Sequence, residues 1–207
     1  MIIKGAIFDF DGTLFDSMSV WDTAGEDYLR GLGREPEPNL QKILKPMSLY
    51  QSACYIQKEY ALSLSPEEIM DGVNKVVEDF YFHTAMPKPG VPEYLEQLRQ
   101  QGVKLCIATA TDRYQIEAAL KRCGLDSYFE EIFTCTAVGH GKDEPHIYEA
   151  ALKYLGTPKH ETLVFEDALH AAQTAKAAGF PVAAVYDAHE PHQAALRSLA
   201  DQYLEHF

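Results

Sequence analysis

The segment IIKGAIFDFDGTLFDS, residues 2–17, joins a short apolar run to two carboxylates and a glycine. The run at 2–8 predicts a buried strand, and Asp9 and Asp11 follow it directly. Ligands of open α/β sheets bind beyond the carboxyl ends of the strands. Because a chain that turns at Gly12 can aim both carboxylates around one centre, the segment predicts the first strand of an α/β fold together with its site.

Further apolar runs and amphipathic stretches alternate along the second half of the chain. The predicted strands are 104–109, 131–135, 162–165 and 181–186. The predicted helices each end at a glycine, which is a common C-terminal signal: Gly102, Gly124, Gly156 and Gly179. This alternation predicts an α/β fold with a doubly wound parallel sheet and helices on both faces.

Residues 17 to about 85 interrupt the alternation with three helical patterns and no convincing strand. One of these helices has a clear start, because Ser65 can serve as N-cap, Pro66 as first helical residue and Glu68 as partner in a capping box. The predicted domains are an α/β core, residues 1–15 and 86–207, and an inserted helical cap, residues 16–85.

Composition limits the classes of function. The 207 residues carry a formal charge of −13 without a cluster of Lys or Arg, which disfavours nucleic acid and anionic membranes as partners. No apolar run approaches the roughly 20 residues that span a bilayer, and the opening apolar stretch does not lead to a signal-peptide cleavage site. The four cysteines form no C-x-x-C pair. We therefore expect a soluble cytoplasmic protein with reduced thiols.

Polar residues suited to one kind of chemistry follow the other predicted strands. Thr109 ends the strand at 104–109, the pair Glu166-Asp167 follows the strand at 162–165, and Lys142 lies in a loop before a helix. Carboxylates of this kind bind divalent cations, and an acidic protein that handles an anionic substrate needs such a local positive charge. The pattern indicates a metal-assisted site for an anionic substrate.

With these residues in place, the sequence resembles the haloacid dehalogenase superfamily, in its branch of sugar phosphatases and β-phosphoglucomutases with a helical cap. The resemblance covers nearly the whole chain and its motifs occur in the family's order. The motifs are DFDGTLFDS at 9–17, IATAT at 107–111, GKDEPHIY at 141–148 and FEDALHAAQTAKAAGF at 165–180. The resemblance implies a Mg²⁺-dependent phosphatase that acts on a small phosphorylated metabolite, as a monomer or weak dimer.

The family's catalytic roles carry over to matching positions. The resemblance implies that Asp9 attacks phosphorus and forms an aspartyl-phosphate, and that Asp11 first donates a proton to the leaving oxygen and then takes one from water. It implies a Mg²⁺ ion held by Asp9, the backbone carbonyl of Asp11 and Asp167, with Glu166 acting through water or behind these ligands. Lys142 would neutralise charge on the nucleophile and on the phosphoryl group.

The implied contacts with phosphate or substrate fall in the first three motifs and in the cap. The positions are Gly12, Thr13, Thr109, Ala110 and Lys142. Trp21 follows the first motif closely enough to touch substrate, or else belongs to the cap core. Arg113 begins a helix after the second motif, where it either binds the distal end of the substrate or serves a helix-cap or surface role. The closing of the cap over the site would exclude bulk water.

Other interpretations of individual motifs depend on specific residues. GHGK at 139–142 lacks the spacing and the Ser or Thr of a P-loop. His189 and His192 are expected to be a surface pair, and His83, His140, His146 and His170 to have structural or solvent roles. Departures from the family also occur, since Ala168 stands where relatives usually have Ser after the acidic pair.

Competing functions share parts of this pattern. A dehalogenase would lack the carboxylate at Asp11, and the cap lysines show no context that favours a phosphonatase. A β-phosphoglucomutase would usually have a His near Trp21 and an Arg where Leu49 stands, so hydrolysis is favoured over isomerisation. A phosphorylation-receiver module would carry no helical cap. The identity of the substrate stays open, because motifs do not fix the cap residues.

Overall fold

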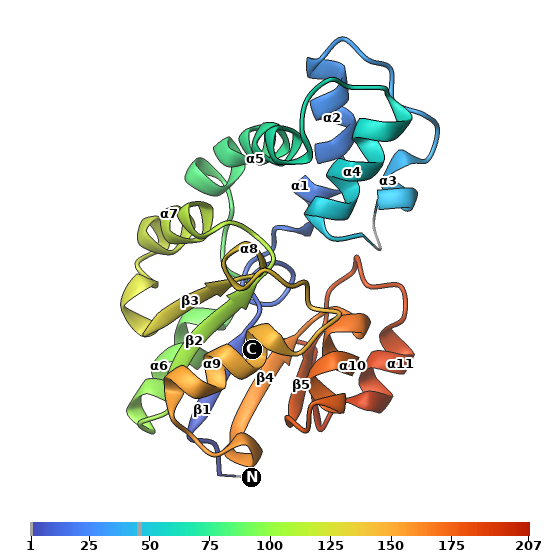
Figure 1. Ribbon diagram of the computed structural model, residues 1–207. Helices are drawn as coiled ribbons and strands as arrows, with labels where there is room; N and C mark the ends of the chain where they lie inside the picture. The colour runs from blue at the N-terminus through green and yellow to red at the C-terminus, as the bar shows by residue number, and fades with distance from the viewer. Residues whose placement is uncertain (1, 45–46) are drawn as a thin grey trace. The chain divides into compact units, whose positions relative to one another are not determined.

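The computed structural model describes residues 2–44 and 47–207 (Figure 1). A six-stranded sheet forms its centre, with every neighbouring pair parallel and the order β3-β2-β1-β4-β5-β6. The strands are β1 Gly5–Phe8, β2 Lys104–Thr109, β3 Glu131–Thr134, β4 Thr162–Glu166, β5 Val182–Val185 and β6 Gln202–Leu204. This arrangement confirms the predicted α/β class and parallel sheet.

Helices connect the strands and cover both faces of the sheet (Figure 1). The helices are α1 Met18–Trp21, α2 Ala24–Gly31, α3 Leu40–Leu44, α4 Leu49–Glu59, α5 Pro66–His83, α6 Val91–Gln100, α7 Arg113–Cys123, α8 Cys135–Val138, α9 His146–Leu155, α10 Leu169–Ala177 and α11 Gln193–Leu199, with short 3-10 turns η1 Asp126–Tyr128 and η2 Lys159–Glu161. No helix in the described ranges is both long and apolar enough to cross a bilayer.

The alternation of side chains along β1 divides the core into two layers. Ile7 packs with residues of α9, α10 and α11 on one face. Phe8 stacks on Phe165 of β4 on the other face, with ring centroids 4.1 Å apart. All four residues of β1 are buried, as expected for a central strand covered on both faces. The strand therefore delivers Asp9 to the middle of the carboxyl edge of the sheet.

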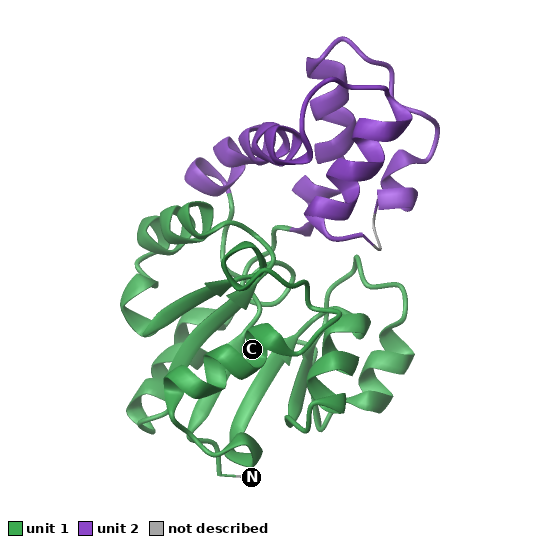
Figure 2. Cartoon of the chain, in the orientation of Figure 1, with its two compact units in different colours: residues 1–17, 85–207 green, residues 18–84 purple. Residues whose placement is uncertain are grey.

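The chain divides into two compact units (Figure 2). One contains the sheet and consists of residues up to Ser17 together with 85–207, and the other, 18–84, contains α1 to α5. Within the helical unit, Ser65 caps α5: its hydroxyl accepts from the backbone amide of Glu68, whose carboxylate accepts from the Ser65 amide. This capping box agrees with the prediction.

Several elements were not predicted from the sequence, among them the turns η1 and η2 and two of the five helices within 18–84. Strand β6 adds a sixth strand, α11 precedes it, and the single turn α8 follows β3. Strand β6 has only three residues, each partly buried, and so it lacks the apolar run that marks the other strands. The fold is thus one strand wider than the sequence indicates.

Candidate active site

Asp9 lies just beyond β1, where the chain leaves the sheet. Its backbone amide donates to the carbonyl of Phe165 at 2.9 Å, which continues the parallel pairing with β4 by one residue. The chain then turns at Gly12, which has a φ of 77° that other residues rarely adopt. The Gly12 amide donates to the Phe15 carbonyl at 2.9 Å and closes the turn. Asp9 is thereby held at a buried position with 7% exposure.

Lys142 connects Asp9 with the end of β4. Its ammonium donates hydrogen bonds to Asp9 Oδ1 and, at 2.7 Å, to Glu166 Oε1. The same Glu166 oxygen accepts from the Tyr148 hydroxyl of α9 at 2.7 Å. Because Lys142 and Glu166 are buried, these charge-assisted contacts fix the ammonium beside the Asp9 carboxylate. Tyr148 is a site residue that sequence reasoning missed, although it lies within the third motif.

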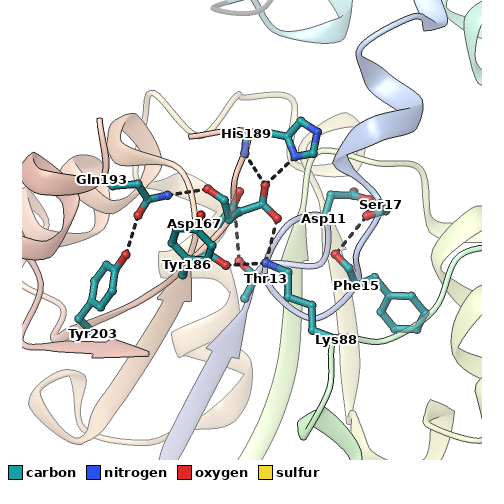
Figure 3. A network of polar contacts seen from close by, with 11 residues as sticks. Asp11, Thr13, Phe15, Ser17, Lys88, Asp167, Tyr186, His189, Gln193 and Tyr203 are labelled. Carbon is teal, nitrogen blue, oxygen red and sulfur yellow. Dashed lines mark hydrogen bonds and ion pairs between the residues drawn. The ribbon is translucent and has the colours of Figure 1, made fainter. Parts of the chain in front are cut away.

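Asp167 completes a group of three buried carboxylates. One side-chain oxygen each of Asp9, Glu166 and Asp167 lies within 4.8 Å of the other two. Asp167 also accepts a hydrogen bond from the Thr13 hydroxyl at 3.2 Å (Figure 3). Carboxylate oxygens at this spacing can hold a metal ion, so the described residues include the acidic cluster that the sequence predicts.

The charges of this cluster do not balance. Three carboxylates face the single ammonium of Lys142. Burial raises the pKa of Glu166 to about 7, with Asp9 adding to the rise and Lys142 opposing it. Burial, followed by the charges of Asp9 and Glu166, likewise raises the pKa of Asp167 well above its usual range. A divalent cation would offset this excess of negative charge.

Two hydroxyl groups hold the carboxylate of Asp11. Ser17 donates to Asp11 Oδ1 and Thr111 donates to Asp11 Oδ2, both at 2.6 Å. Thr111 lies just beyond β2, and its backbone amide donates to the hydroxyl of Thr109 at 3.1 Å. Thr109 is the fully buried last residue of β2. The structure therefore brings the first two motifs together, through hydroxyl groups to which the sequence-based interpretation had given no role.

Two predicted substrate contacts, Arg113 and Trp21, have hydrogen-bond partners within their own units. The guanidinium of Arg113 pairs with Glu131 Oε1 at 2.5 Å and donates to the carbonyl of Ile132. Glu131 and Ile132 open β3, whereas the acidic cluster lies at the carboxyl edge of the sheet, so the structure does not place Arg113 among the cluster. Trp21 belongs to the helical unit, where its indole N–H donates to the Tyr81 hydroxyl at 2.8 Å. Ala110 is exposed directly after β2.

The loop after β5 supports the edge of the cluster (Figure 3). Asp187 forms an ion pair with Lys88 at 2.8 Å and accepts from the His189 amide at 2.9 Å. In the same loop, Glu190 accepts a hydrogen bond from the Leu169 amide at 3.0 Å, at the start of α10. Ala168 has no side-chain oxygen that could cap this helix, and Glu190 instead satisfies the backbone amide of the first residue of α10.

Comparison with known proteins identifies the family. The family model of haloacid dehalogenase-like hydrolases matches residues 6–185, which is most of the chain. The chain belongs to the haloacid dehalogenase-like hydrolase family. This confirms the resemblance stated from the motifs, and with it the prediction that the chain is an enzyme of the phosphatase type.

Individual relatives match over nearly their full length. A phosphorylated carbohydrates phosphatase of Thermotoga maritima is 25% identical over 86% of this chain and 82% of its own. Pyrophosphatase PpaX of Halalkalibacterium halodurans is 30% identical over 89% of this chain and 84% of its own. Among solved structures, CbbY of Rhodobacter sphaeroides in complex with phosphate has a TM-score of 0.87 and 21% identity, covering 99% of this chain and 95% of that one. The last likeness shows the fold.

Proposed function

We propose that this chain is a Mg²⁺-dependent phosphatase that hydrolyses a small organic phosphate, of the sugar phosphate class, through an aspartyl-phosphate on Asp9. The observation that carries the proposal is the buried ammonium of Lys142 between Asp9 and Glu166, with Asp167 adjacent. The relatives named as a phosphatase of phosphorylated carbohydrates and as a pyrophosphatase support the substrate class.

Asp9 would act as the nucleophile. One of its carboxylate oxygens attacks phosphorus, a new O–P bond forms, and the bond to the leaving alcohol oxygen breaks with its electron pair. Water then attacks the phosphorus of the aspartyl-phosphate, which releases inorganic phosphate and restores the carboxylate. Lys142 stabilises the charge on Asp9 and on the phosphoryl oxygens, because it is held in place before the substrate arrives.

Asp11 would transfer the proton in both steps. It donates a proton to the leaving oxygen in the first step and accepts one from the attacking water in the second. Both oxygens of its carboxylate accept hydrogen bonds, from Ser17 and from Thr111. These bonds fix the orientation of the carboxylate, so Ser17 and Thr111 are positioning residues in this proposal.

Mg²⁺ would be held by side-chain oxygens of Asp9 and Asp167 and by the backbone carbonyl of Asp11. Glu166, which already accepts from Lys142 and Tyr148, would contribute through water. The donors are all oxygens, as Mg²⁺ prefers, and the excess of carboxylates over ammonium groups leaves room for a divalent charge. When bound, the ion would stabilise negative charge on the phosphoryl group.

The phosphoryl group would be held by groups of the first three motifs. Gly12, Thr13, Thr109, Ala110 and Lys142 are the proposed contacts. Trp21 stays a predicted substrate contact from the helical unit. Arg113 can contact the substrate only if its ion pair with Glu131 breaks, so that the guanidinium is free to bind the substrate instead.

The test is release of inorganic phosphate from a panel of sugar phosphates, pyrophosphate and an aryl phosphate, with and without Mg²⁺. Asp9→Asn should abolish release, because an amide is a poor nucleophile. The matched control is Asp16→Asn, which changes an exposed carboxylate of the same motif and should leave release intact. Conversion of a hexose 1-phosphate into its 6-phosphate without net release would instead indicate a mutase.

A further inference from the structure

A second group of possible metal ligands lies on the segment between α8 and α9. His140 Nδ1 is 2.5 Å from Glu144 Oε2, and the same oxygen is 3.3 Å from His146 Nε2. The two imidazole rings have centroids 4.0 Å apart. One ligand atom from each of the three residues lies within 4.8 Å of the other two. Two ring nitrogens and one carboxylate oxygen thus converge from a stretch of seven residues.

This geometry suits a first-row transition-metal ion. Zn²⁺ binds imidazole nitrogen and carboxylate oxygen at about 2.0–2.2 Å, so neighbouring ligand atoms in a tetrahedral site are roughly 3.3 Å apart. The longer contact of the Glu144 oxygen, 3.3 Å to His146, equals that value, and the shorter one, 2.5 Å to His140, would lengthen when an ion enters. The side chains of His140, Glu144 and His146 are 46%, 50% and 48% exposed, so water can fill further coordination positions. Imidazole ligands favour Zn²⁺, Ni²⁺ or Cu²⁺ over Mg²⁺.

Ordinary surface ion pairing explains the arrangement less well. A pair between an exposed histidine and a carboxylate contributes little to stability, and one such pair needs no third partner. Here a single oxygen of Glu144 faces ring nitrogens of both histidines. His189 and His192 offer a comparison, because they also flank an acidic residue, yet Glu190 between them accepts from backbone amides.

We propose that His140, Glu144 and His146 form a binding site for Zn²⁺ or a similar transition-metal ion, distinct from the carboxylates of Asp9, Glu166 and Asp167. The site does not rest on the proposed phosphatase activity. Its ligands lie on both sides of Lys142 in the sequence, while the Lys142 side chain is only 8% exposed and reaches Asp9. A bound ion would therefore hold the segment that delivers Lys142.

The experiment is a Zn²⁺ titration of the full chain, in excess Mg²⁺, followed by NMR of the histidine ring nitrogens. We expect about one equivalent of Zn²⁺ to move the signals of His140 and His146 and to leave those of His189 and His192 in place. In His140→Ala, the His146 signals should no longer move at that concentration, with Zn²⁺ affinity at this site lowered at least about tenfold. The matched control, His189→Ala with His192→Ala, should bind as the wild type does.

Hydrogen exchange gives a second measurement that does not depend on enzyme activity. Zn²⁺ should slow exchange of the backbone amides of 140–146 in the wild type and in the control, and not in His140→Ala. Circular dichroism verifies that each variant is folded. Signals of His140 and His146 that stay fixed in a folded wild type at millimolar Zn²⁺ would overturn the proposal, and so would His146 signals that move in His140→Ala as they do in the wild type.

Discussion

Asp11 is the residue whose surroundings say most about its proposed role. Its two carboxylate oxygens accept hydrogen bonds from Ser17 and Thr111, which lie 6 and 100 residues away in the sequence. Hydrogen bonds to the charged form of a carboxylate favour that form and restrict its orientation. A proton-transfer group held in this way can meet the leaving oxygen without further reorganisation.

Thr111→Val tests this positioning. The substitution keeps the branched shape and removes the hydroxyl, so kcat for phosphate release should fall about tenfold while KM changes little. A kcat equal to that of the wild type across the pH range would show that the Thr111 hydroxyl has no part in proton transfer.

Asp187 should make the stability of the fold depend on pH in the acidic range. Burial alone would raise the pKa of Asp187, but hydrogen bonds from Lys88 and from the His189 amide outweigh it and lower the pKa. A lowered folded pKa gives stability that is present above the unfolded pKa of about 3.9 and is lost as pH falls through the folded value. Asp187→Asn should therefore unfold at a lower temperature than the wild type at pH 7, with a smaller difference at pH 3.

Thermal unfolding followed at both pH values measures this effect. Asp79→Asn is the control, because the Asp79 side chain is 87% exposed and its replacement should change little at either pH. An equal difference between Asp187→Asn and the wild type at the two pH values would contradict the assignment.

Sequence reasoning identified Asp9, Lys142, Glu166 and Asp167 as neighbours because each stands at the end of a strand or just before a helix. It missed the roles of Ser17, Thr111 and Tyr148. No sequence pattern indicates which group a Ser, Thr or Tyr hydroxyl will hydrogen-bond. The partners of these hydroxyls lie on segments that the fold brings together. The predicted metal and substrate contacts remain predictions for the experiments above.

At the scale of elements, the backbone conformation just before α6 requires a glycine at position 90. Gly90 has a φ of 85°, and a Cβ at this position would lie 2.5 Å from the carbonyl oxygen of Phe207. The ring of Phe207 packs against Tyr94 with centroids 5.2 Å apart. The contact therefore joins the C-terminal residue to the start of α6.

Gly90→Ala should lower the free energy of unfolding by more than the roughly 1–2 kcal/mol of a left-handed backbone alone, because the backbone of Phe207 must also move. Gly102→Ala is the matched control. Gly102 also has a positive φ, 72°, but a Cβ there has no neighbour within 4 Å. Denaturant unfolding compares the two variants, and equal losses would show that the contact with Phe207 contributes nothing.

Elements with a clear hydrophobic pattern in the sequence were predictable, and the elements that were missed lack such a pattern. The strands β1, β2 and β4 are nearly continuous apolar runs, which is the pattern of buried parallel strands. Strand β6 is three partly buried residues, QYL, at the edge of the sheet. Helix α11 follows His192, which makes no side-chain capping bond. Tertiary contacts with β5 and α10 stabilise these elements, and such contacts leave no local signal.

At the scale of the molecule, the acidic cluster should couple metal binding to stability. Asp9, Glu166 and Asp167 are buried against a single ammonium, so their mutual repulsion opposes folding without a cation. A metal ion that binds only the folded state stabilises it by mass action.

The relative thermal stability of Asp167→Asn and the wild type should therefore depend on whether Mg²⁺ is present. Without divalent cations the variant should unfold at a higher temperature than the wild type, because one buried negative charge is removed. In excess Mg²⁺ the wild type should gain several degrees and the variant little or none. Thermal scans with and without Mg²⁺ measure both effects, and an equal gain in the two proteins would place the cation elsewhere.

The order of motifs and the interruption at residues 17 to about 85 indicate the family from the sequence alone. The structure shows two compact units. The helical unit spans 18–84, whereas the predicted cap spans 16–85. Substrate choice could not be predicted, because motifs do not fix the cap residues, and Trp21 stays a predicted substrate contact. In the helical unit Trp21 already donates to Tyr81.

The most direct test of the account is detection of the phosphorylated intermediate. The Mg²⁺-loaded enzyme is mixed with a hydrolysed substrate carrying a radiolabelled phosphate, quenched in acid during turnover and reduced with borohydride, which converts an aspartyl-phosphate into homoserine. If Asp9 is the nucleophile, the protein carries label before reduction and homoserine at position 9 after it, and Asp9→Asn shows neither. Turnover without label on the wild type, or homoserine at another position, would contradict the assignment of Asp9 as the nucleophile.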